Sequence, residues 1–152
     1  MIRESLIRVK QDFKSKDEVI RAIVLAADAD GLLTSAGDFA EAVYHREEEI
    51  STSIGYGIAI PHGKTDAVKE AFIAFVSLQE PIRWDEGGTD DVEAVFLIGV
   101  PQTNTEMLHL KAIAAISKRL MREEFRKQLY ACTDNHAAFQ MLDDIDKSIA
   151  DG

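Results

Sequence analysis

The stretch Phe72–Leu78, which reads Phe-Ile-Ala-Phe-Val-Ser-Leu, decides the fold class. It is a nearly continuous apolar run that stops at Pro81, and a second run, Val92–Val100, is interrupted only by Glu93 and stops at Pro101. Runs that are apolar on both faces are expected of interior strands covered by helices on each side. The two runs therefore predict an α/β fold.

Two helices are predicted ahead of this stretch. Ser15 with Glu18 forms a capping-box pattern, and apolar residues then recur at helical spacing until Gly31. Ser35 with Asp38 opens the second helix, which runs toward Arg46 and an acidic segment at 47–49. We interpret that acidic segment as a solvated face. A short apolar run at 6–9 near the N-terminus is a candidate edge strand.

Three helices are predicted behind the stretch. Thr103 with Glu106 is another capping box, and the helix after it carries His109 on one stripe with Ile113 and Ile116, so His109 should point inward. A short helix is expected around 125–129. A last helix, capped by Thr133 or Asp134, carries Phe139, Leu142 and Ile145.

Composition fits one globular domain spanning residues 1–152. The chain has 46% hydrophobic and 29% charged residues, with no repeat or low-complexity linker. Seventeen Lys and Arg against 27 Asp and Glu leave a net charge of −10, which disfavours nucleic acid and anionic lipid as partners. Charges interrupt every apolar stretch before about 18 residues, so we expect no direct membrane insertion.

The single cysteine, Cys132, cannot form an internal disulfide, and the N-terminus has no basic and apolar secretion signal. A reducing cytoplasm is the expected location.

The strongest candidate for chemistry is His62, which follows Gly57-Ile58-Ala59-Ile60-Pro61 and precedes Gly63. Pro61 fixes its own φ and favours extended geometry before it, while Gly63 has no Cβ and lets a bulky group approach the backbone. The strand at 58–60 should therefore run into a loop that holds out the imidazole. From local chemistry alone, an ordinary loop histidine is the more frequent case.

The motif from Gly57 to Gly63, with Arg46 ahead of it and His109 behind it, resembles the enzyme IIA domain of the fructose/mannitol type from the bacterial sugar phosphotransferase system. The resemblance runs from about Leu6 to Ile145. It implies a mixed, mostly parallel β-sheet flanked by helices on both faces, in agreement with the predicted order of strands and helices.

The resemblance also implies a function. His62 would accept a phosphoryl group on Nε2 from the histidine-containing phosphocarrier HPr and pass it to a cysteine of a cognate enzyme IIB, which serves a membrane IIC permease. Phosphoryl transfer of this kind depends on positioning and positive groups, so no metal or other cofactor is expected. A second interpretation is a regulatory IIA of the nitrogen-related branch, in which phosphorylation of the same histidine changes which proteins are bound.

Arg46 and His109 match the family's other active-site positions, so the resemblance assigns Arg46 to the phosphoryl group and His109 to a supporting hydrogen bond. Each has a simpler alternative: an ion pair of Arg46 with Glu48 or Glu49, and a core role for His109. Zinc would need a third ligand beyond the two histidines, and no spacing supplies one.

Other side chains are assigned no role. His45 and His136 are expected to lie on the surface, and Trp84 is expected to be a packing residue.

Overall fold

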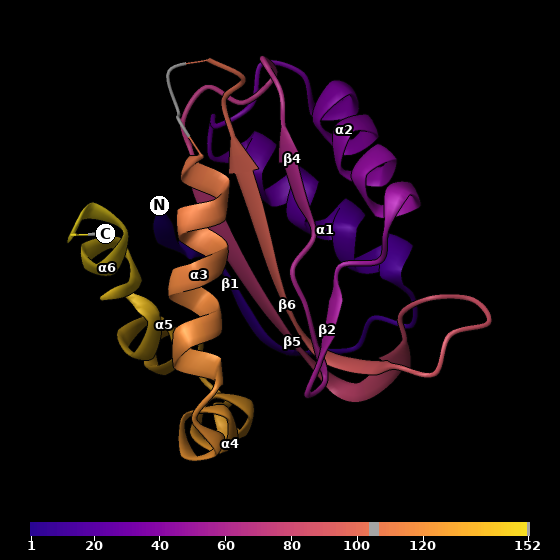
Figure 1. The fold of residues 1–152 in the computed structure, drawn as a ribbon, viewed down its shortest axis with the longest axis vertical. Helices are drawn as coiled ribbons and strands as arrows, with labels where there is room; N and C mark the ends of the chain where they lie inside the picture. Colours follow the sequence, from indigo (N-terminus) through magenta and orange to yellow (C-terminus); the bar gives the residue numbers. More distant parts are fainter. Residues whose placement is uncertain (104–106, 152) are drawn as a thin grey trace.

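A computed structural model of the chain describes residues 1–103 and 107–151, and a six-stranded sheet lies at its centre with helices on both faces (Figure 1). The strands are β1 (Ile2–Gln11), β2 (Ser53–Gly55), β3 (Ile58–Ala59), β4 (His62–Lys64), β5 (Phe72–Arg83) and β6 (Asp91–Val100). The helices are α1 (Lys16–Ala29), α2 (Ala36–Glu49), α3 (Leu108–Leu120), α4 (Glu123–Ala131), α5 (Asn135–Leu142) and α6 (Ile145–Asp151).

The sheet has the order β1-β5-β6-β3-β2. Strand β4 also pairs with β6, at residues 98–100, whereas β3 pairs with it at residues 94–95. The pairs β1–β5, β3–β6 and β4–β6 are parallel, whereas β5–β6 and β2–β3 are antiparallel. The predicted mixed, mostly parallel sheet is therefore confirmed. The N-terminal run forms the edge strand β1 and is longer than its apolar core indicated.

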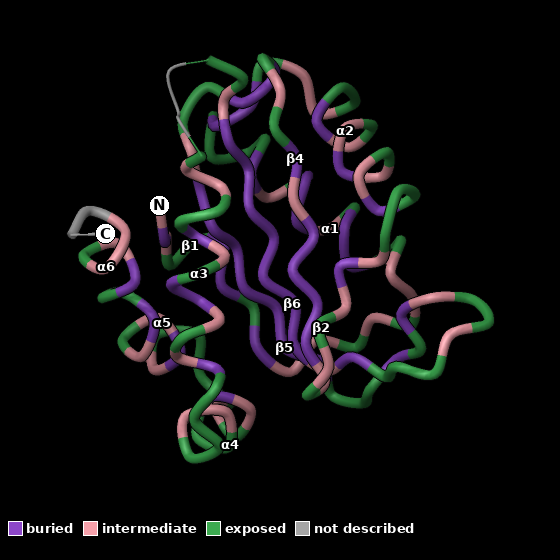
Figure 2. The backbone as a smooth tube through the Cα atoms, viewed as in Figure 1, coloured by how far each residue is buried: buried purple, intermediate pink, exposed green. Residues whose placement is uncertain are grey.

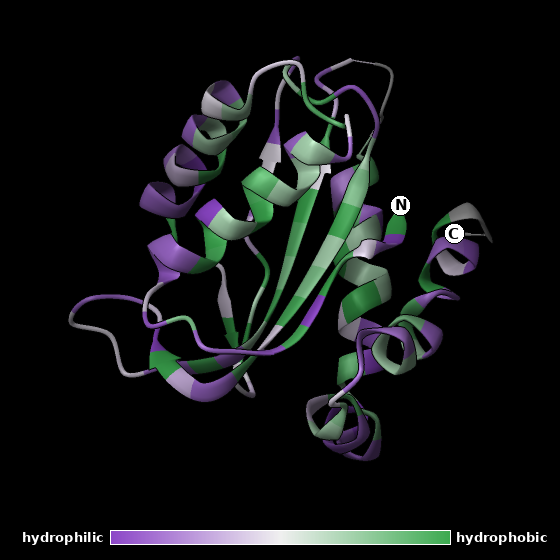
Figure 3. Ribbon diagram, turned by 180° about the vertical axis from the view of Figure 1, so that it is seen from behind, coloured by the Kyte–Doolittle hydropathy of each residue, from purple (hydrophilic) through white to green (hydrophobic). Residues whose placement is uncertain are grey.

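Both faces are buried at residues 72–78 of β5 and 94–100 of β6, as these apolar runs predict (Figure 2). Alternate residues of β5 face opposite sides, so Phe72 and Ala74 pack with α1 and α2, whereas Ile73 and Phe75 pack with the helices that follow β6. Figure 3 shows green, hydrophobic strands enclosed by helices whose outer faces are largely purple. The two faces of the sheet thus support two separate hydrophobic clusters.

Three of the helices begin at N-terminal caps that the sequence predicts. The hydroxyls of Ser15 and Ser35 each accept a backbone N–H in the first turn, and Asp134 caps α5. The helix carrying His109 begins at Leu108, after Met107 in a left-handed conformation without a side-chain cap, and the predicted capping partner Glu106 lies outside the described residues.

The prediction of one last helix was wrong. Helix α5 ends at Leu142, and Ile145 begins α6. No helix in the described part of the chain is both long and apolar enough to cross a bilayer.

Candidate functional site

His62 is the first residue of β4, at the side of the sheet between α2 and α3. It pairs in register with Ile98, which belongs to the hydrophobic cluster on the α3 side, so the imidazole leaves the sheet on that side. The sequence predicted a loop after Pro61; the structure instead continues as a short strand. Backbone pairing with β6 therefore fixes the position of His62 more firmly than a loop would.

Gly63 lets α2 pack directly against β4. A Cβ at this position would lie 3.0 Å from Val43 Cγ2 and 3.1 Å from Phe39 Cε1. The sequence predicted a close approach of a bulky group here, and these two side chains are that group. Because Arg46 lies one turn after Val43, this contact also brings the guanidinium toward His62.

The His62 ring is oriented by a backbone carbonyl two residues earlier in the chain. Nδ1 lies 3.3 Å from the carbonyl oxygen of Ile60, and a carbonyl can only accept, so Nδ1 carries the hydrogen and Nε2 keeps its lone pair. Burial lowers the pKa of His62 below that of a free imidazole, and the charge of Arg46 adds to this, although the Ile60 bond and the carboxylates of Glu47 and Glu49 oppose it. The ring is therefore neutral at pH 7.

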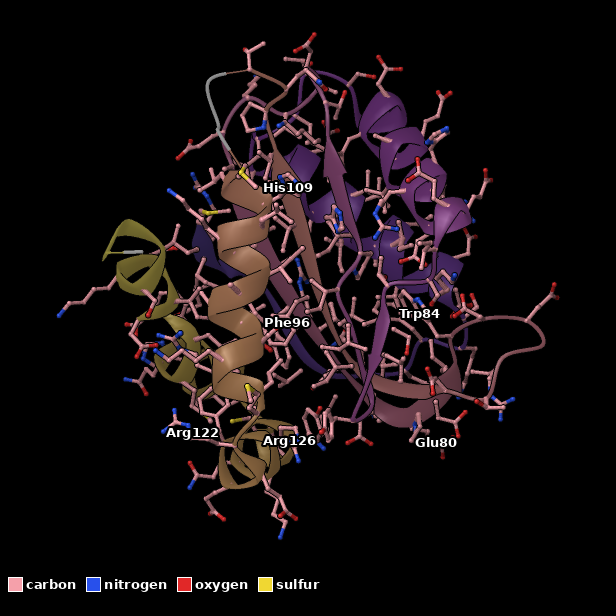
Figure 4. All side chains as sticks on the ribbon, viewed as in Figure 1. Glu80, Trp84, Phe96, His109, Arg122 and Arg126 are labelled. Atoms are coloured by element: carbon pink, nitrogen blue, oxygen red, sulfur yellow. The ribbon has the colours of Figure 1, made fainter. Side chains whose placement is uncertain are left out.

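His109 lies beside His62, in agreement with the role that the family resemblance implies for it. The ring centroids are 5.8 Å apart and the planes are inclined by 31°. His109 comes from the first turn of α3, at the opposite end of the helix from Arg122 (Figure 4). Burial, followed by the neighbouring His62 and Lys64, lowers the pKa of His109. Its Nδ1 is buried and has no hydrogen-bond partner among the described residues.

An open depression of about 590 Å³ joins these groups to α2, and its lining includes Arg46, Lys64 and both rings. Arg46 Nη1 donates to the carbonyl oxygen of Ile50 at 2.7 Å, at the end of α2. Glu49 pairs with His45 at 3.5 Å, and no ion pair of Arg46 is found within the described residues. The remaining guanidinium donors are thus available to a group in the depression.

Several residues that line this depression have no role in the site predicted from the sequence, among them Lys64 and His45. Lys64 follows His62 by two positions in β4, so both side chains project from the same side of the strand. The signal was present in the sequence, but it is readable only if residues 62–64 are recognised as a strand. His45 is a surface residue, 75% exposed as expected, yet it lines the rim.

The prediction that the acidic segment at 47–49 is a solvated face is wrong for its first residue, Glu47. The Glu47 side chain is only 4% exposed, and its carboxylate accepts from Lys16 Nζ at 3.1 Å and from the Thr52 hydroxyl. Lys16 also contacts Asp85 at 2.7 Å. A buried carboxylate needs partners of this kind, and they come from segments that the local sequence does not identify.

The remaining predicted groups stay apart from the depression. Cys132 is a free thiol, and His136 pairs on the surface with Glu4 at 2.6 Å. Trp84 is buried at 2% exposure, which confirms its packing role. In residues 1–103 and 107–149, no three side chains of the metal-binding types form a cluster.

Residues 1–145 match the family described as "Phosphoenolpyruvate-dependent sugar phosphotransferase system, EIIA 2". The chain belongs to this EIIA family. It is 36% identical over 87% of its length to an Escherichia coli 2-O-alpha-mannosyl-D-glycerate-specific EIIABC component and 32% identical over 92% of its length to a fructose-specific EIIA component of Haloferax volcanii. It spans 20% of the first relative and 90% of the second.

Solved structures agree with this membership. The nitrogen regulatory protein IIA-Ntr from Neisseria meningitidis has a TM-score of 0.83 at 26% identity, with 93% of the EIIA chain and 95% of that chain covered. The Escherichia coli complex of enzyme IIAMTL with phosphorylated enzyme IIBMTL has a TM-score of 0.80 at 21% identity, with 94% and 99% covered, and supports the fold alone. This chain is therefore a phosphotransferase-system component with the EIIA fold.

Proposed function

We propose that this EIIA chain is a phosphocarrier: His62 Nε2 accepts a phosphoryl group from an HPr-type protein and passes it to a cysteine of a cognate enzyme IIB, which serves a IIC permease in sugar uptake. The observation that carries the proposal is the Ile60 carbonyl on Nδ1, 3.3 Å away, because it leaves Nε2 as the nucleophile.

Each step conserves the phosphoryl group. The P–N bond of the donor phosphohistidine breaks as the bond to His62 Nε2 forms, and the donor imidazole keeps the electron pair. In the second step the P–N bond to His62 breaks and a P–S bond to the enzyme IIB thiolate forms. Little covalent work falls to the protein, so positioning and charge compensation supply most of the rate.

The cations of the depression fit this task. Arg46 has free donors and the planar geometry that suits phosphoryl oxygens, and Lys64 adds a point charge on the same side of β4 as His62. We assign His109 a hydrogen bond from Nε2 to a phosphoryl oxygen. An unpartnered buried lone pair on Nδ1 costs less than an unpartnered buried N–H, which favours the tautomer with hydrogen on Nε2.

Reconstitution with enzyme I, HPr and labelled phosphoenolpyruvate tests the proposal. Label should enter the wild-type chain as an acid-labile phosphohistidine, be absent from His62→Gln, and move on to enzyme IIB. Label in folded His62→Gln would contradict the assignment of His62.

A regulatory role of the nitrogen-related type is the second candidate, favoured by the match to IIA-Ntr. Both candidates use His62 in the same way. Transfer from the phosphorylated chain through an enzyme IIB to a sugar supports the phosphocarrier. A stable complex with another protein that forms in only one phosphorylation state, without onward transfer, supports regulation.

A further inference from the structure

We propose that Glu47 and Thr52 are positioning residues that hold the His62 imidazole in its reactive tautomer and fix it relative to Arg46. The inference rests on the proposed function of His62 as phosphoryl acceptor. It assigns a role to Glu47, whose side chain was predicted to be solvated and is buried. Three links carry it.

The first link anchors the end of α2. Glu47 is the residue after Arg46, and its side chain is buried in the protein, with 4% exposed. Lys16 from the start of α1 holds one carboxylate oxygen at 3.1 Å, and the Thr52 hydroxyl donates to the other. The last turn of α2 is thereby tied to α1 and to the segment that follows.

The second link joins this anchor to the strand before His62. The carbonyl of Thr52 accepts the backbone N–H of Ile60 at 3.0 Å. The carbonyl of Ile60 lies 3.3 Å from His62 Nδ1. Thr52 therefore contacts Glu47 through its side chain, and through its backbone it contacts Ile60, the residue whose carbonyl orients the imidazole.

The third link is that the end of α2 positions both Arg46 and, through Thr52, the carbonyl that orients His62. Arg46 precedes Glu47 on α2, and its Nη1 donates to the carbonyl of Ile50 at 2.7 Å, two residues before Thr52. The last turn of α2, anchored by Glu47, thus fixes the position of the Arg46 guanidinium directly and that of the Ile60 carbonyl through Thr52. A displacement of this turn would move both groups relative to the phosphoryl position.

A purely stabilising role is the weaker explanation for a buried acid at this place. Burying an ion pair costs desolvation that its attraction only partly offsets, so apolar residues would hold the helix as well. Hydrogen bonds of fixed geometry, in contrast, are what positioning of a reactive ring requires.

The matched variants are Thr52→Val, which removes the hydroxyl and keeps the shape, and Thr52→Ser, which keeps the hydroxyl. Ser53→Ala is the control, because Ser53 lies in the same segment and its hydroxyl donates to Asp90 at 3.1 Å, not to Asp85, which shares Lys16 with Glu47. Thr52→Ala is the second variant if the valine methyl prevents folding beside Glu47. Melting temperatures are measured for all, and rates are expressed per folded molecule.

Two readouts separate positioning from stability. The ¹⁵N shifts of His62 in the unphosphorylated chain at alkaline pH should show hydrogen on Nδ1 in wild type, Thr52→Ser and Ser53→Ala, and a mixture of tautomers in Thr52→Val. Phosphoryl acceptance should fall about 10- to 100-fold in Thr52→Val, the size expected of a displaced reacting group, and stay within about 2-fold in the other two.

Unchanged tautomer and unchanged rate in a destabilised Thr52→Val or Thr52→Ala would overturn the inference, as would an equal loss in Ser53→Ala. Failure of the wild-type chain to accept phosphate would instead remove the proposed function, and it would leave the tautomer measurement as an independent test of the positioning contact.

Discussion

The imidazole rings of His62 and His109 lie 5.8 Å apart, one carried by β4 and the other by the first turn of α3. Their environments push both pKa values in the same direction, since burial lowers each, and the charge of His62 further lowers that of His109. At neutral pH both rings are therefore neutral, as the proposed roles of His62 as nucleophile and His109 as hydrogen-bond donor require. This leaves Arg46 and Lys64 as the permanent cations lining the depression.

The His109 position should affect transfer more than stability. His109→Ala removes a donor proposed to serve the phosphoryl group, so onward transfer should slow by on the order of 10² to 10³ at most, while His62 still accepts phosphate. His109→Gln, which retains a donor, should be less impaired. Single-turnover transfer and the melting temperature are measured on the same samples. A lower melting temperature with normal transfer would make His109 a core residue only.

Arg46 is expected to be needed for its geometry as well as its charge. Arg46→Lys keeps the charge but loses the planar fork, so transfer should slow, and Arg46→Ala should slow it further, by on the order of 10² or more. Arg46→Ala also loses the bond to the Ile50 carbonyl, worth about 1 kcal/mol. Denaturant unfolding measures that part separately. Unchanged transfer to enzyme IIB in Arg46→Ala would contradict the role.

Gly63→Ala should separate α2 from β4. The added methyl would meet Val43 at 3.0 Å and Phe39 at 3.1 Å, so overpacking should cost about 1 to 3 kcal/mol. Arg46 would then sit farther from His62, and transfer per folded molecule should fall as well. Gly37→Ala is the control, since a Cβ there has no neighbour within 4 Å. Equal stability of the two variants would mean that α2 adjusts without strain.

The sequence predicted what depends on local patterns. The apolar runs at 72–78 and 92–100 gave the buried strands, and Ser15 and Ser35 marked the starts of α1 and α2, because caps and burial periods are encoded within a few residues. The motif around His62 pointed to the site because its residue types and order were specific.

What the sequence could not predict depends on pairing between distant segments. Glu47 resembles its solvated neighbours until Lys16 and Thr52 are brought against it. Strand β4 is too short for a periodic pattern, so Lys64 was not recognised beside His62. The break between α5 and α6 likewise has no glycine or proline to mark it.

His136 offers a contrast with the histidines of the site. Its exposed ring bonds Glu4, and this bond raises the pKa of His136. The sign follows: the folded state holds the proton more tightly, so the small stabilisation is present below about pH 6.5 and is lost as pH rises through the folded-state pKa. His136→Gln should remove that dependence and leave phosphoryl transfer unchanged. Slowed transfer in this variant would show that the site extends beyond the depression.

The pH dependence of stability should have the opposite sign at His62. Burial lowers its folded-state pKa below the ordinary value of 6.5, so the unfolded chain binds more protons in the interval between the two. Stability must therefore rise with pH across this interval, and the gain is complete above about pH 6.5.

Denaturant unfolding between about pH 5 and 7.5 measures this slope of stability against pH, above the range in which ordinary carboxylates titrate. His62→Gln should make the slope less positive, and the slope that remains combines His109, whose pKa is also lowered, with His136, whose raised pKa contributes with the opposite sign. Phosphoryl acceptance should follow the neutral fraction of His62, with a midpoint below 6.5. Identical slopes in wild type and His62→Gln, or an acceptance midpoint above 6.5, would contradict a neutral nucleophile held in a partly buried site.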